Sequence, residues 1–123
     1  MNTLITKRKI RYLLIESSAP IDVKKRAVSE ELSRNLLLFL GELTNYRANP
    51  HINSQIGERV FLLRINRGFE REVLAALATI KKSGGVEAGF YTLKISGTAK
   101  KLITFYRRHI LPDSGQDSSK SRT

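Results

Sequence analysis

The 123-residue chain contains no cysteine and no long apolar run. Without cysteine it can form neither disulfides nor thiolate metal sites, which fits a cytoplasmic protein. No stretch approaches the roughly 18 consecutive apolar residues that a membrane helix needs, and MNTLITKRKI lacks the apolar core of a signal peptide. We therefore expect one compact cytoplasmic domain that neither spans nor binds a membrane.

Acidic residues are missing from two segments. Residues 88–112 carry five cations and no acid, and residues 1–15 carry four cations and no acid. Together these segments hold nine of the eleven net positive charges, whereas the rest of the chain mixes both signs. Because segregated positive charge is more typical of a polyanion-binding site than of a uniformly basic surface, we expect a nucleic-acid partner.

Patterns that support catalysis are also missing. His51 and His109 are far apart in the sequence and have no neighbouring acid, which argues against a metal-binding or general-base role. There is no glycine-rich phosphate loop, no Ser-His-Asp spacing and no carboxylate cluster suited to Mg²⁺. The sequence therefore disfavours a free-standing nuclease and predicts no metal and no cofactor bound by the protein itself.

Hydrophobic periodicity predicts seven elements in one domain. They are a strand at 9–16, a helix at 23–43, a weak strand at 47–54, a strand at 59–65, a helix at 69–82, a strand at 86–95 and a helix at 98–110. Asp22 is the expected N-cap of the first helix, whose apolar stripe runs from Val28 to Leu43, and Gly84-Gly85 is the expected end of the second. Residues 1–8 form a basic extension, 9–112 the domain, and 113–123 a disordered tail.

This βαββαβ order predicts an α+β, ferredoxin-like split-βαβ sandwich with an additional C-terminal helix and antiparallel sheet order 4-1-3-2. In that order the end of strand four, at 95–97, lies beside the start of strand one, at 7–9, so that the two basic segments converge. Strands one and three are apolar on both faces. The sheet face turned away from the first two helices therefore needs a cover, either the third helix or a protein partner.

The C-terminal helix is expected to carry its cations on one face and its apolar residues on another. On a helical wheel one face carries Lys100, Lys101, Thr104, Arg107 and Arg108, and the inward stripe carries Ala99, Ile103, Tyr106 and Ile110. The simpler interpretation is a solvent-exposed face whose last arginines interact favourably with the partial negative charge at the helix C-terminus. An RNA-phosphate site is favoured, because ordinary exposed helix faces mix acids with bases.

The tripeptide Ser96-Gly97-Thr98 precedes this helix. Ser96 or Thr98 can cap the helix while Gly97 permits an unusual turn, or the helix N-terminus can bind phosphate beside Lys94. These interpretations are compatible. The predicted RNA-binding residues are Lys7, Arg8, Lys9, Lys94, Ser96, Gly97, Thr98, Lys100, Lys101, Arg107 and Arg108.

Two further features concern other partners. Strand three offers only Phe61 as an aromatic, so base stacking on the sheet is disfavoured. Leu37 and Leu38 point away from the core stripe of the first helix. They are either buried under residues 45–54 or form a patch for another protein.

Three stretches carry a resemblance to a known family: RYLLIE at 11–16, REVLAALATIKKSGG at 71–85 and LKISGTAKKL at 93–102. They resemble the second protein component of archaeal ribonuclease P, whose eukaryotic counterpart is shared by ribonuclease P and ribonuclease MRP. The resemblance covers about residues 10–111. It departs from the family at the irregular stretch 48–55 and in the unusually apolar run 36–40.

The resemblance implies a ferredoxin-like, non-catalytic subunit of a ribonucleoprotein. The RNA of that enzyme removes the 5′ leader of precursor tRNA with Mg²⁺ held by RNA, so the protein contacts precursor tRNA only indirectly. The implied protein partner is component 3, a TIM-barrel-like subunit, and both a homodimer and a heterotetramer stay open. The alternatives are a ferredoxin-like regulatory module with a small-ligand site and a generic RNA-binding protein.

Overall fold

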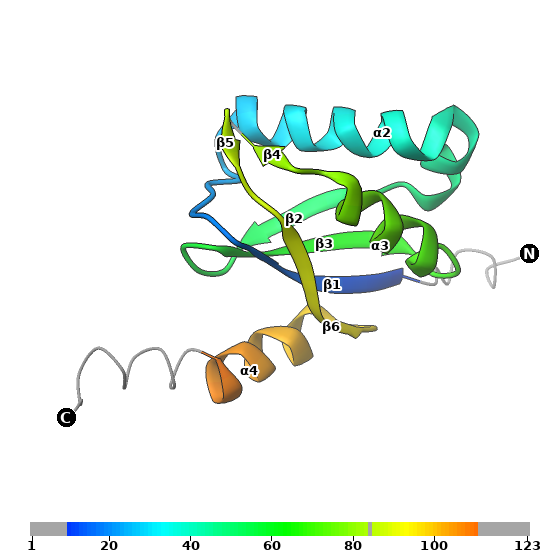
Figure 1. Cartoon of the computed structure of the whole chain (residues 1–123). Helices are drawn as coiled ribbons and strands as arrows, with labels where there is room; N and C mark the ends of the chain where they lie inside the picture. The colour runs from blue at the N-terminus through cyan, green and yellow to red at the C-terminus, as the bar shows by residue number, and fades with distance from the viewer. Residues whose placement is uncertain (1–9, 84, 111–123) are drawn as a thin grey trace, which may run out of the picture.

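The computed structural model describes residues 10–83 and 85–110, which form a four-stranded sheet with helices on both faces and a separate two-stranded hairpin (Figure 1). The elements are β1 (Ile10–Ser17), α2 (Arg26–Ala48), β2 (His51–Gln55), β3 (Val60–Asn66), α3 (Glu70–Thr79), β4 (Lys82–Ser83), β5 (Val86–Glu87), β6 (Phe90–Ser96) and α4 (Ala99–His109). The four-stranded sheet has the order β2-β3-β1-β6 with antiparallel neighbours. This confirms the predicted order, read from the opposite edge.

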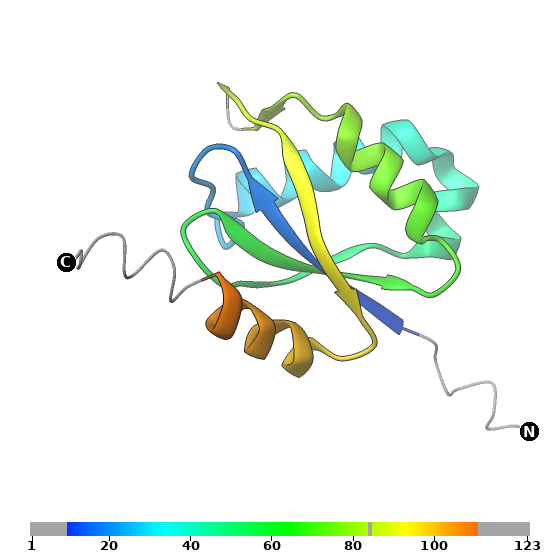
Figure 2. The same cartoon turned by 60° about the horizontal axis from the view of Figure 1, so that its bottom comes forward.

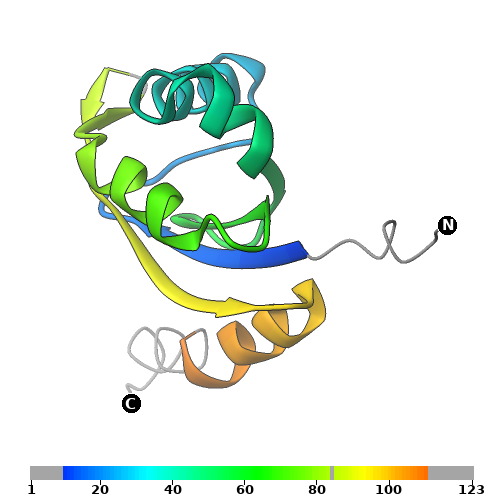
Figure 3. The ribbon, with the colours of Figure 1, turned by 90° about the vertical axis from the view of Figure 1, so that its right-hand side faces the viewer.

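Side chains of the two central strands pack alternately into two cores. Leu13 and Ile15 of β1 lie in the core under α2 and α3, whereas Leu14 between them lies in the core under α4. Figure 3 shows the resulting three layers, with α2 and α3 on one side of the sheet and α4 on the other. Helix α4, and in particular the fully buried Leu102, is therefore the cover that the two-sided strands required.

Helix α2 differs from its prediction at both ends. It begins at Arg26 because Asp22 caps an earlier turn, where its Oδ1 accepts a hydrogen bond from the Lys24 amide at 3.0 Å. It reaches Ala48, but Gly41 interrupts it with φ 83° and ψ 162°, a conformation that only glycine adopts readily. The expected stripe is wrong in its C-terminal part, since Phe39 before the break is 49% exposed and Leu43 beyond it is 60% exposed.

The second predicted helix is too long. Helix α3 ends at Thr79, and Ile80 is already extended. Residues 82–83 then pair with residues 86–87 as a hairpin, so Gly85 lies in that hairpin and does not cap the helix, and Gly84 lies outside the described residues. The predicted strand at 86–95 is accordingly divided into β5 and β6.

No helix of the described residues is both long and apolar enough to cross a bilayer. The predicted basic extension at 1–8 and the predicted tail at 113–123 lie outside the described residues.

Candidate nucleic-acid interface

The Ser96-Gly97-Thr98 turn joins edge strand β6 to α4 beside the beginning of β1. Tyr12 of β1 pairs with Ser96, and Figure 2 shows the end of β6 and the start of α4 next to the first residues of β1. The Nη1 atom of Arg11 lies 3.3 Å from the point that a Cβ on Gly97 would occupy. This distance places the Arg11 guanidinium directly beside the turn, and a small shift of this flexible side chain would accommodate a Cβ at residue 97.

This register corrects two predictions. The residues beside 95–97 are those around Arg11 to Leu13, not 7–9, and Lys7, Arg8 and Lys9 lie outside the described residues. Gly97 is not among the described glycines with positive φ, so the expected unusual turn is absent there. Arg11 was left out of the predicted RNA-binding set, although the sheet order together with an exact register would have identified it.

The hydroxyls of the turn cap the start of α4. Thr98 Oγ1 accepts a hydrogen bond from the Lys101 amide at 3.3 Å, and Ser96 Oγ accepts one from the Thr98 amide at the same distance. The capping interpretation is therefore confirmed. Capping accounts for one amide of the first turn and leaves the helix N-terminus as a region of positive potential.

The cations of α4 lie on one exposed face. Lys100, Lys101, Arg107 and Arg108 are all exposed, and Thr104 lies exposed among them. The described residues form the ion pairs Arg11–Glu70 and Arg26–Glu30 among others, and neither of these two involves α4. The cations of α4 therefore share one face, as the wheel predicted, and they form no ion pair with an acid of the described residues.

The opposite stripe of α4 is wider than predicted. Leu102, which the prediction omitted, is the fully buried residue of the helix, and Phe105 also packs against the smaller core. Tyr106 packs there too, with its hydroxyl against Gly57 in the turn before β3. Because residues 102 and 105 belong to the stripe that packs on the sheet, the cationic face lies on the opposite side of the helix and points away from the sheet.

Lys94 differs from the other cations. The pairing of β6 with β1 is irregular here, because Lys94 pairs with Leu14 whereas Thr92 pairs with Ile15. As a result, the two consecutive residues Leu93 and Lys94 both lie near α4. The Lys94 Nζ lies 5.1 Å from the centroid of the Phe105 ring, a cation–π contact. This contact fixes the position of the Lys94 ammonium at the border of the cationic face.

A second candidate surface lies on the other side of the molecule. Leu38 is 75% exposed and Leu37 is 38% exposed, so burial under residues 45–54 is wrong for both leucines. Leu38 and Phe39 line a shallow groove with Lys81 and Lys82. An apolar patch beside basic residues is a surface that a protein partner can cover.

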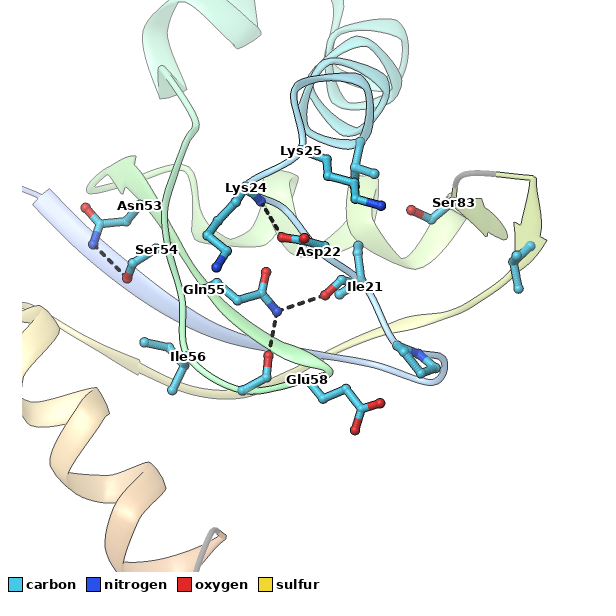
Figure 4. A pocket seen from close by; sticks show the side chains of 14 residues that line it. Ile21, Asp22, Lys24, Lys25, Asn53, Ser54, Gln55, Ile56, Glu58 and Ser83 are labelled. Carbon is cyan, nitrogen blue, oxygen red and sulfur yellow. Dashed lines mark hydrogen bonds between the residues drawn. The ribbon is translucent and has the colours of Figure 1, made fainter.

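A concave site between α2, β2 and the hairpin bears on the ligand-binding alternative (Figure 4). Gln55 is its central polar side chain. Its Oε1 accepts from the Val23 amide at 2.8 Å, and its Nε2 donates to the carbonyls of Ile21 and Gly57. Because these bonds join parts of the chain to each other, Gln55 serves the loop and is not free for a ligand.

No metal site is visible in the described part of the chain, where no three His, Asp or Glu side chains come together. His51 contacts Asn49, and His109 contacts Phe105. Phe61 is fully buried, so the sheet presents no ring from β3 to a base.

A model of the Rpp14/Pop5 family matches residues 11–107, which include β1, the turn and most of α4. The chain belongs to the Rpp14/Pop5 family. Members of the Rpp14/Pop5 family are protein subunits of the ribonuclease P and ribonuclease MRP ribonucleoproteins, which confirms the predicted family.

This Rpp14/Pop5 chain is similar to two known proteins. Ribonuclease P protein component 2 of Methanocorpusculum labreanum is 26% identical over 109 residues, or 89% of this chain and 71% of that protein. A chain in the cryo-EM structure of yeast ribonuclease MRP matches with a TM-score of 0.54 at 11% identity, covering 92% of this chain and 96% of that one. The second likeness supports the fold alone.

Proposed function

We propose that the chain is a non-catalytic protein subunit of ribonuclease P, which binds and supports the RNA that removes 5′ leaders from precursor tRNA. The observation that carries the proposal is the exposed, acid-free cationic face of α4 in a member of the Rpp14/Pop5 family. Lys and Arg that neutralise phosphates release counterions, and this release provides binding energy without an enzyme site.

The proposed contact runs from Arg11 across the Ser96–Thr98 turn to the end of α4. The turn offers the helix N-terminus to a phosphate, with Lys100 and Lys101 beside it. Arg107 and Arg108 continue the same row one to two turns further along the helix. Such contacts position a structured RNA and carry no base information. Lys7, Arg8 and Lys9 are proposed to extend the contact along the N-terminal segment.

In this function the protein itself binds no cofactor, and Mg²⁺ acts through the RNA. The complex is proposed to work in the cytoplasm.

We propose component 3 of ribonuclease P as the protein partner, bound at the patch of Leu37 and Leu38. Both leucines are exposed on α2, on the opposite side of the sheet from α4. Protein and RNA can therefore bind at the same time.

The experiment is to isolate the tagged full-length chain from its own cells and sequence the RNA that copurifies. We expect ribonuclease P RNA to dominate, and we expect the purified complex to process precursor tRNA only while that RNA is intact. A mixture of unrelated RNAs would instead favour a generic RNA-binding protein. Processing by RNA-free protein with Mg²⁺ would overturn the non-catalytic assignment.

A further inference from the structure

The aromatic rings of α4 border its cationic face. At 100° per residue, Phe105 and His109 follow Lys101 and Arg108 around the helix. Residues three or four apart are neighbours on a helix surface, so Phe105 is adjacent to Lys101, Arg108 and His109. The border between phosphate-binding cations and rings therefore runs along the C-terminal half of α4.

Two of these rings, Phe105 and His109, are in tilted contact. The Phe105 and His109 ring centroids are 4.8 Å apart with an interplanar angle of 39°. Lys94 Nζ also lies over the Phe105 ring, 5.1 Å from its centroid. Phe105 is half-buried against the smaller core, whereas His109 is exposed. His109 is thus an exposed ring supported from behind by a fixed one.

We propose that this part of α4 holds one unpaired nucleotide of the bound RNA. Its base stacks on the His109 ring, and its phosphate lies against Lys101 and Arg108. A supported ring beside two uncompensated cations combines the two features that bind single-stranded nucleic acid, a stacking surface and a basic track. The inference rests on the proposed RNA-binding function and adds that the site takes an unstacked base as well as phosphates.

The probes are two oligonucleotides of equal length, an oligoadenylate and the same backbone with abasic residues. The test variant is His109→Gln, which removes the ring and keeps a residue of good helix propensity. Loss of one stacked base should weaken oligoadenylate binding by about tenfold. It should leave abasic binding and the salt dependence unchanged, because no phosphate contact is lost. His109→Tyr should restore the affinity.

An equal loss on both probes, or no loss on either, would overturn the inference. Lys101→Ala with Arg108→Ala separates this failure from failure of the proposed function. If that double variant weakens binding of both probes and of ribonuclease P RNA while His109→Gln changes nothing, phosphate binding stands and the nucleotide site is rejected. If neither variant changes any binding, both proposals are rejected.

Discussion

The two faces of the sheet are built differently. Among residues 10–83 and 85–110, fifteen buried residues form the core under α2 and α3 and four form the core under α4, so the first face contributes more apolar burial to folding. The first face is covered by helices that mix acids with bases, and α4 carries cations alone. A helix held by a small core and bearing one sign of charge suits a binding surface, because its exposed face is free of structural constraints.

The largest effect is expected from the larger core. Phe61 is fully buried and its ring meets Phe90 edge-on at 6.1 Å between centroids. Phe61→Ala should lower the free energy of unfolding by about 3–5 kcal/mol, a large part of a typical domain's stability. Thermal and urea unfolding measure it. A loss under about 1 kcal/mol would contradict the dominance of this core.

A substitution in the smaller core, under α4, should destabilise α4 more than the rest of the fold. Leu102→Ala removes the buried contact of α4 with Leu14 and Leu62, at a cost of about 2–5 kcal/mol for leucine truncations. Native-state hydrogen exchange should show α4 amides exchanging faster while β1 and β3 stay protected. Equal acceleration throughout would show that the two faces unfold as one unit, and the comparison would lose its energetic basis.

A glycine outside α4 fixes how closely that helix approaches the sheet. A Cβ at Gly57 would collide with the hydroxyl of Tyr106. Gly57→Ala should cost about 1–3 kcal/mol of stability, because overpacking forces neighbours to move. Adding Tyr106→Phe should recover part of it, which a double-mutant cycle measures. Strict additivity of the two changes would exclude this contact as the cause.

The patch on α2 should matter for assembly more than for folding. Leu37→Glu with Leu38→Glu should change the free energy of unfolding by no more than about 0.5 kcal/mol, as exposed substitutions usually do. The same variant should lose copurification with component 3. The control is Tyr91→Glu on β6, which places a carboxylate at another large, 58% exposed side chain away from the patch. Equal loss for both variants, or none for either, would reject the patch as the interface.

The strand pattern predicted the fold well because burial on both faces leaves an unambiguous signal. Leu13 and Leu14 of β1 lie in different cores, as do Phe61 and Leu62 of β3, as expected, and the sheet order follows from the βαββαβ sequence of elements. Helix ends were predicted less well. The break at Gly41 and the hairpin after Thr79 depend on backbone geometry and tertiary pairing, which periodicity does not contain.

The candidate site was predicted in its composition but not in its detail. The cationic row of α4 could be read from the sequence because residues 88–112 contain no acid. Arg11 beside Gly97 and Lys94 over Phe105 could not, since each depends on strand register and on the irregularity in β6. Contacts between distant segments needed the structure.

The central claim is that the α4 face, rather than net charge, binds RNA. The direct measurement is the slope of log affinity for ribonuclease P RNA against log salt concentration, for two variants that remove equal charge. Lys101→Ala with Arg108→Ala alters the α4 face, and Lys24→Ala with Lys25→Ala alters exposed lysines across the sheet, before α2. The first should reduce the slope by about 0.7–0.9 per lost contact and the second should leave it nearly unchanged. Equal slope changes would show that binding follows net charge alone and would contradict the account.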